Sequence, residues 1–95
     1  MFYYKIMKVR EAQIFSDNVV AIIKQEQIKK GISNYALAEL SGLSEASLSY
    51  IFHNQRRPTL YTLMMITEAL GLSLSEIIAN AERNAHLHKE KARHY

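Results

Sequence analysis

Apolar residues recur at helical spacing through most of the chain, in five segments that short polar turns separate. The first segment begins near Ser16 or Asp17, which are both good N-cap residues, and ends at Lys30. Each later segment follows a Ser or Thr, and each turn holds a Gly or Asn, the residues that best tolerate a left-handed backbone. The pattern predicts helices over 16–30, 34–41, 45–53, 60–70 and 74–87, with Ser33, Ser44, Thr59 and Ser73 as N-caps and Gly31, Gly42, Asn54 and Gly71 as stops.

The apolar faces of these helices define the expected hydrophobic core. Residues three and four apart lie on one side of a helix, so each segment contributes one stripe. The side chains that we expect to face the core are Val19, Ile22, Ile23, Tyr35, Leu37, Ala38, Leu40, Leu48, Ile51, Phe52, Leu60, Leu63, Met64, Ile66, Thr67, Leu70, Leu74, Ile77, Ile78, Ala81 and Ala85.

The two ends of the chain lack this pattern. Residues 1–13 alternate between two sides of an extended chain, and β-forming residues such as Tyr3 and Val9 dominate. They predict a short strand or extended arm, which would need a partner such as its copy in a second chain, or else a partly ordered leader. Residues 88–95 are polar, and we expect this tail to fray. The expected domain therefore covers residues 14–87.

The second and third helices are joined by only the three letters "SGL", with Gly42 at the pivot. Ala38 is small where the two helices must approach closely. Helices that cross steeply around a three- or four-residue turn containing Gly form a helix-turn-helix, whereas the alternative is an ordinary helical hairpin. We interpret residues 33–54 as a helix-turn-helix.

The run from Gly31 to Ile78 resembles the phage lambda repressor and Cro-like helix-turn-helix family of transcriptional regulators, often called the XRE family. The family's elements appear in order, as "LA" in the second helix, "SGLS" at the turn, "SLSYIF" in the third helix, then "RRPTLYTL" and "ITEALGLSLSEI". The resemblance implies an all-α fold of five helices, with double-stranded DNA as the partner.

Three positions depart from the family's pattern. Asn34 stands where many members carry Gln, and Glu45 stands where they carry Gln or Arg. Asn54 replaces a Gly that often follows the third helix. The first two positions bear on which bases are recognised, and the third is a conservative change because Asn also adopts positive φ.

Composition narrows the range of partners. The 95 residues suffice for one hydrophobic core but not for two, and a net charge of +3 permits binding to nucleic acid without establishing it. There is no cysteine, no apolar run of the roughly 20 residues of a membrane span, and no signal-peptide pattern, so we expect a cytoplasmic protein. Between Asn34 and Gln55 the only formal charges are Glu39 and Glu45. Electrostatic attraction to DNA must therefore come from the flanks of the third helix.

The third helix is expected to present short polar side chains to a DNA groove. If Leu48 faces the core, Ala46 and Tyr50 point away from it. Glu45 lies in the first turn, the part of a recognition helix that enters the major groove, although an acid there can also simply stabilise the helix dipole. A carboxylate can accept from cytosine, a hydroxyl can meet either kind of base edge, and a methyl or ring can pack on thymine. The expected base contacts are Glu45, Ala46, Ser47, Ser49 and Tyr50.

Contacts to the phosphate backbone come from basic and small polar side chains and from helix N-termini. Such residues surround the third helix. The alternative for the Arg pair is a solvated loop, but its place beside the groove-facing helix favours DNA contact. The expected phosphate contacts are Lys30, Ser33, Asn34, Ser44, His53, Asn54, Arg56 and Arg57.

Two functions fit this pattern. The first is a sequence-specific regulator that represses transcription by occupying an operator, since a chain of this length has no room for an effector domain. The second is an antitoxin that binds a toxin protein and its own operator. We expect no enzyme, no cofactor and no metal site, because no Ser stands in a nucleophile motif and His86, His88 and His94 lack helical ligand spacing.

We expect a homodimer on a palindromic operator, because one helix-turn-helix covers only a few base pairs. Two surfaces could form it. One is the arm Phe2–Val9, and the other is the stripe of the last helix, namely Leu74, Ile77, Ile78, Ala81 and Ala85. The alternative is that this stripe completes the core and the arm is loose.

Overall fold

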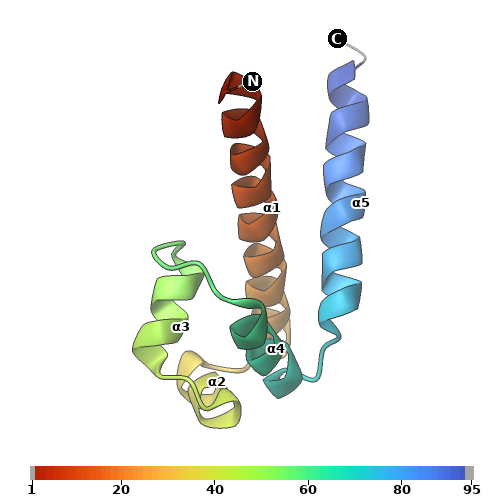
Figure 1. Cartoon of the computed structure of the whole chain (residues 1–95). Helices are drawn as coiled ribbons and strands as arrows, with labels where there is room; N and C mark the ends of the chain where they lie inside the picture. The colour runs from red at the N-terminus through yellow and green to blue at the C-terminus, as the bar shows by residue number, and fades with distance from the viewer. Residues whose placement is uncertain (1, 94–95) are drawn as a thin grey trace.

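The computed structural model describes the backbone of residues 2–93 and the side chains of residues 9–85. Within the described backbone the chain is all-α and contains no strand, which confirms the predicted fold class. The helices are α1 (Phe2–Lys29), α2 (Asn34–Ser41), α3 (Glu45–Phe52), α4 (Leu60–Ala69) and α5 (Leu74–Arg93), and their arrangement is shown in Figure 1.

The helix ends have the chemistry that the sequence predicts. The hydroxyls of Ser33, Ser44 and Thr59 accept hydrogen bonds from the N–H groups three residues later, at 3.1, 3.0 and 3.1 Å. Gly42 has φ 79° and Asn54 has φ 59°, both in the left-handed region where Gly and Asn are favoured. The three hydroxyl caps satisfy N–H groups that would otherwise lack partners at the starts of α2, α3 and α4.

All five helices contribute to one hydrophobic core. Two leucines, Leu37 of α2 and Leu48 of α3, are fully buried, so the two helices are held against each other and against α1 and α4. Burying one such side chain stabilises the fold by about 1.5–3 kcal/mol. The buried apolar residues are Val19, Val20, Ile23, Leu37, Leu48, Ile51, Ile66, Leu70, Ile77 and Ala81.

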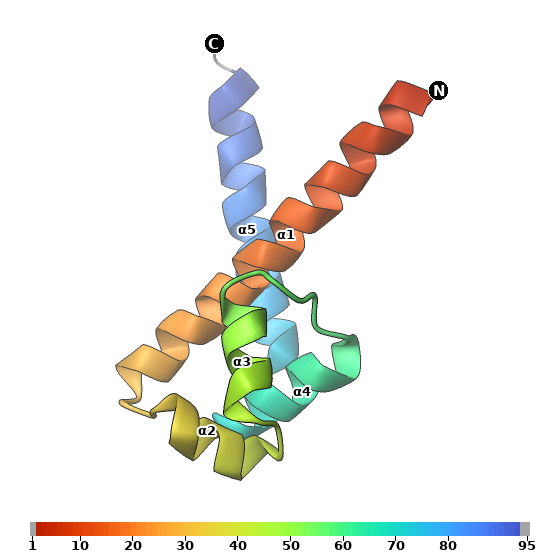
Figure 2. The ribbon, with the colours of Figure 1, turned by 90° about the vertical axis from the view of Figure 1, so that its left-hand side faces the viewer.

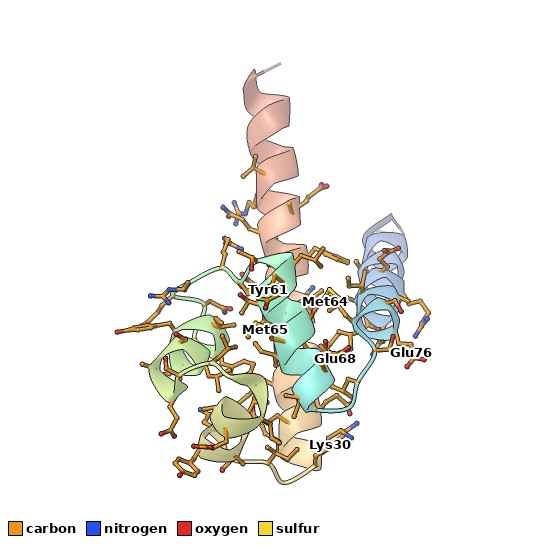
Figure 3. The ribbon with its side chains drawn as sticks, turned by 60° about the horizontal axis from the view of Figure 1, so that its bottom comes forward. Lys30, Tyr61, Met64, Met65, Glu68 and Glu76 are labelled. Atoms are coloured by element: carbon orange, nitrogen blue, oxygen red, sulfur yellow. The ribbon has the colours of Figure 1, made fainter. Side chains whose placement is uncertain are left out.

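Four side chains that we expected in the core are exposed instead. Tyr35, Leu40, Leu60 and Met64 have exposed fractions of 65, 62, 64 and 48%. The helices α2 and α4 are short and each buries one narrow stripe, so apolar residues beside that stripe remain at the surface, where such residues are common. Leu40 and Met64 line an open hollow of about 450 Å³ between α2 and α4 (Figure 3). Its lining residues are Leu40, Ser41, Tyr61, Met64, Met65, Glu68 and Ala69.

The N-terminal strand or arm that we expected is wrong, because α1 is one helix from Phe2 onward. Ser16 and Asp17, the expected caps, lie inside it. No Gly or Pro interrupts residues 2–30, and Lys, Met, Arg, Glu, Ala and Gln, which favour helices, fill much of residues 5–13. A lone strand would leave its backbone groups without partners, whereas a helix satisfies them internally.

The last helix also extends beyond its expected end. α5 continues to Arg93, so the tail that we expected to fray after Leu87 is helical. The side chains of His86 and His88 lie outside the described residues, and so does all of His94. In Figures 1 and 2 the outer halves of α1 and α5 project beyond the cluster of α2, α3 and α4.

Within the described residues, no single helix is both long and apolar enough to cross a membrane. The segments Leu60–Ala69 and Leu74–Ala85 reach that length and apolarity only when taken together, and the chain bends by 108° between them.

Candidate nucleic-acid interface

The turn between α2 and α3 has the geometry of a helix-turn-helix. The N–H of Gly42 donates to the carbonyl oxygen of Ala38 at 3.0 Å, which closes α2 before the chain reverses. The N–H of Leu43 then donates to the Ser41 hydroxyl at 3.3 Å. Ala38 and Leu43 both pack against the core, so the short turn is held by local bonds and by burial.

The buried and the exposed residues of α3 lie on opposite sides of the helix, as the helical spacing predicts. Leu48 and Ile51 are buried, and Phe52 packs partly against the core. On the outside Glu45, Ala46 and Tyr50 are exposed, with Ser47 and Ser49 half-buried beside them. The five residues that we expect to contact bases therefore lie together on one accessible part of a helix whose position the core determines.

Two serines at the start of α3 form a hydrogen-bonded pair. The Ser44 hydroxyl accepts from the N–H of Ser47 at 3.0 Å and donates to the Ser47 hydroxyl at 2.9 Å. Ser44 therefore spends its own proton within the pair, so a phosphate at this helix end would meet backbone N–H groups rather than the Ser44 side chain. The Ser47 proton remains free to donate to a base acceptor.

The loop after α3 carries its cations beside the exposed face of that helix. The Arg56 guanidinium carbon lies 5.2 Å from the Tyr50 ring centroid, a cation–π distance. The Arg57 Nη1 lies 3.5 Å from Oδ1 of Asp17 on α1, and both side chains are substantially exposed. Such a pair contributes at most about 1 kcal/mol and is easily exchanged for a phosphate.

His53 ends α3 with a fixed ring orientation. Its Nδ1 lies 2.8 Å from the carbonyl oxygen of Ser49, which can only accept, so Nδ1 carries a proton. The residue is exposed at the C-terminal end of α3. Asn54 follows in the left-handed turn and is exposed.

The start of α2 shows a polar network that the sequence did not reveal to us. Oδ1 of Asn34 accepts from Nε2 of Gln27 at 2.8 Å and from Nζ of Lys24 at 3.2 Å. Gln27 is buried on the inner face of α1, one turn beyond Ile23. The sequence signal for this network was that Gln27, a polar residue, continues the apolar stripe of α1. A buried amide at that position needs hydrogen-bond partners. Ser33, the other candidate at this helix start, is exposed.

Lys30 lies three residues before Ser33 and four before Asn34, the other candidates near the start of α2. It is exposed just after the end of α1, as Figure 3 shows. The neighbouring Lys29 makes a surface ion pair with Glu26 at 3.5 Å. The remaining candidates surround α3.

Residues 23–77, more than half of the chain, match the family model described as helix-turn-helix. The chain is also similar to the HTH-type transcriptional regulator PuuR of Escherichia coli (strain K12) and to its namesake in Shigella flexneri, with 38% identity to each over 61 residues. These matches cover 64% of this chain and 31% of each relative, so the chain spans less than a third of the length of these relatives. The chain belongs to the helix-turn-helix family of lambda repressor and Cro-like regulators, which confirms the resemblance that its motifs predict.

Proposed function

We propose that the protein is a transcriptional regulator that binds double-stranded DNA with α3 in the major groove. The observation that carries this proposal is the two-sided character of α3. Leu48 and Ile51 anchor the helix in the core, while Glu45, Ala46 and Tyr50 are exposed on its outer side. The two similar regulators are both described as transcriptional regulators, which supports the same function.

Base recognition in this proposal uses hydrogen-bonding and apolar groups rather than positive charge. The Glu45 carboxylate accepts from a cytosine amino group, and the free Ser47 proton donates to a base acceptor. Ala46 and the Tyr50 ring pack on thymine methyl groups. Ser47 and Ser49 are both half-buried, and the Ser49 hydroxyl lies 3.3 Å from Nδ1 of His53.

Affinity comes from the residues around α3. The positively charged side chains of Arg56 and Arg57 contact phosphates, and the N-termini of α2 and α3 donate hydrogen bonds from backbone N–H groups. The phosphate contacts that we propose are made by the side chains of Lys30, Ser33, Asn34, His53, Asn54, Arg56 and Arg57. Ser44 contributes through the backbone N–H groups at the start of α3. In such a complex the protein represses transcription by occupying an operator that polymerase needs.

The working unit in this proposal is a homodimer on a palindromic operator. Ile77 and Ala81 are buried within one copy, so these two residues of the α5 stripe belong to its own core, whereas Leu74, Ile78 and Ala85 are half-buried. The outer half of α1 projects from the domain (Figure 2), and Val9 and Ile14 on it are 57 and 53% exposed. Apolar side chains at these positions favour pairing with a second copy over exposure to water.

Base recognition by α3 is tested with Glu45→Gln and Tyr50→Ala. Each variant should change which base pair is preferred at one position of each half-site while leaving binding to random duplexes nearly unchanged. A lost base contact costs about 1–3 kcal/mol at its own position, which is about 5- to 150-fold in discrimination. The measurement is competition binding with duplexes that differ by single base pairs.

The chain offers a control for each variant. Glu76 is an exposed acid in the first turn of α5, as Glu45 is in α3, and Tyr61 is an exposed tyrosine on α4. Glu76→Gln and Tyr61→Ala should leave the preference unaltered. If Glu45→Gln and Tyr50→Ala also keep the wild-type preference, α3 does not recognise bases through these side chains.

A further inference from the structure

A buried amide and a half-buried ammonium group hold the side chain of Asn34. Gln27 is only 2% exposed, and its Nε2 donates to the Ile32 carbonyl oxygen at 3.0 Å and to Oδ1 of Asn34 at 2.8 Å. Nζ of Lys24 donates to the same Asn34 oxygen at 3.2 Å and to Oε1 of Gln27 at 3.2 Å. Nζ also lies 4.7 Å from the centroid of the Phe52 ring in α3. The network therefore connects α1, the turn before α2, the start of α2, and α3.

This network determines which group Asn34 can offer to a ligand. An amide oxygen has two lone pairs, and here two donors already occupy Oδ1 of Asn34. The amide group is planar, so Nδ2 lies on the other side of the side-chain carbon and keeps its two N–H donors. A DNA phosphate offers only acceptors, so an Asn34 side chain held this way matches it. The ammonium on Oδ1 polarises the amide and strengthens Nδ2 as a donor.

We propose that Gln27 and Lys24 are positioning residues, which hold the Asn34 amide with its donors toward a phosphate of the bound duplex. This inference rests on the proposed function. Gln27 cannot act on DNA directly because it is buried, so its effect on binding must pass through Asn34. The same network fixes the start of α2 relative to α3, so the phosphate contact and the base-contacting helix keep one spacing.

The inference is tested by a double-mutant cycle, which separates positioning from general stability. The affinity of Gln27→Met and Lys24→Met is measured with and without Asn34→Ala, on the duplex that the wild-type chain selects from a random pool. Each single substitution should weaken binding about 5- to 10-fold, the effect of a poorly placed hydrogen bond to a charged group. In the Asn34→Ala background the effect of Gln27→Met should fall below about twofold, whereas Lys24→Met retains a small loss from its missing charge.

Thr67 provides a control for stability. It is also 2% exposed, and its hydroxyl donates to the Leu63 carbonyl oxygen at 3.0 Å within α4. Thr67→Val removes a buried hydrogen bond within α4, which has no member of this network, so it should lower thermal stability without any effect on affinity that depends on Asn34. An equal loss of affinity for Gln27→Met in both backgrounds would overturn the inference, because the residue would then act only on the fold.

A second measurement uses the unaltered chain. The side-chain N–H signals of Asn34 in a ¹⁵N-labelled sample should shift when the selected duplex is added, and this test remains if Gln27→Met does not fold. Unchanged signals in a saturated complex would overturn the inference while leaving the proposed function intact. If the wild-type chain enriches no duplex, the proposed function fails, and the inference fails with it.

Discussion

Replacing Arg56 and Arg57 together by alanine should weaken binding to every DNA duplex by about 10- to 100-fold at physiological salt. Both residues lie in the exposed loop after α3, and α3 itself contains no Lys or Arg. The slope of log affinity on log salt is negative, and each lost phosphate contact reduces its magnitude by about 0.9. Loss of both arginines should therefore reduce the magnitude by about 1.8. The sequence preference should not change, because phosphates are the same in every sequence.

The measurement is a salt titration of binding to the selected duplex and to a random one. Arg10→Ala with Arg83→Ala is the matched control, since both arginines are exposed but lie on α1 and α5 rather than around α3. That control removes the same net charge and should leave the slope nearly unaltered. An unchanged slope in the Arg56 and Arg57 variant would place the phosphate contacts elsewhere. The Arg57–Asp17 pair is exposed, so its loss should change stability little.

Introducing glutamate at both Val9 and Ile14 should convert the proposed dimer into a monomer. Negative charges at these two exposed positions of α1 would be desolvated in the proposed interface and would repel their copies across it. Light scattering should report a mass that falls from twice 11.0 kDa to 11.0 kDa. Affinity for a palindromic duplex should fall by about 10²- to 10⁴-fold, because the second half-site no longer benefits from linkage to the first.

Gln25→Glu with Asn80→Glu adds the same charge at two exposed positions outside the outer half of α1, so it leaves the surroundings of Val9 and Ile14 unaltered. This control should stay dimeric if the interface involves the apolar positions rather than all of α1. A wild-type chain that is monomeric at working concentration would contradict the homodimer proposal before any variant is made.

The ends of α2, α3 and α4 and the helix-turn-helix were predictable because they depend on neighbouring residues. A cap such as Ser33 bonds to an N–H only three residues away, and the conformation of Asn54 depends on its own side chain. The two-sided character of α3 follows equally from its helical period, once Leu48 is assigned to the core. These features need no knowledge of how distant segments pack.

The errors arose where the outcome depends on distant contacts. Alternation over residues 2–9 favours a strand, whereas the helix-favouring residues of 5–13 and the lack of Gly or Pro favour a helix, so the local signals conflict. Leu40 is exposed because, within the described residues, α4 leaves an open hollow beside α2 instead of covering it. Tyr35 is exposed on the same helix, and the pattern of one helix cannot show either outcome. The contact of Gln27 with Asn34 depends on how the turn at Gly31 brings α1 and α2 together.

The central claim is that α3 binds a specific duplex sequence, and selection from a random pool of duplexes tests it most directly. The wild-type chain should enrich one sequence with twofold symmetry, whose half-sites lie about 34–36 Å apart or a multiple of that. Enrichment of no sequence over the starting pool, under low-salt conditions that allow nonspecific binding, would contradict the account.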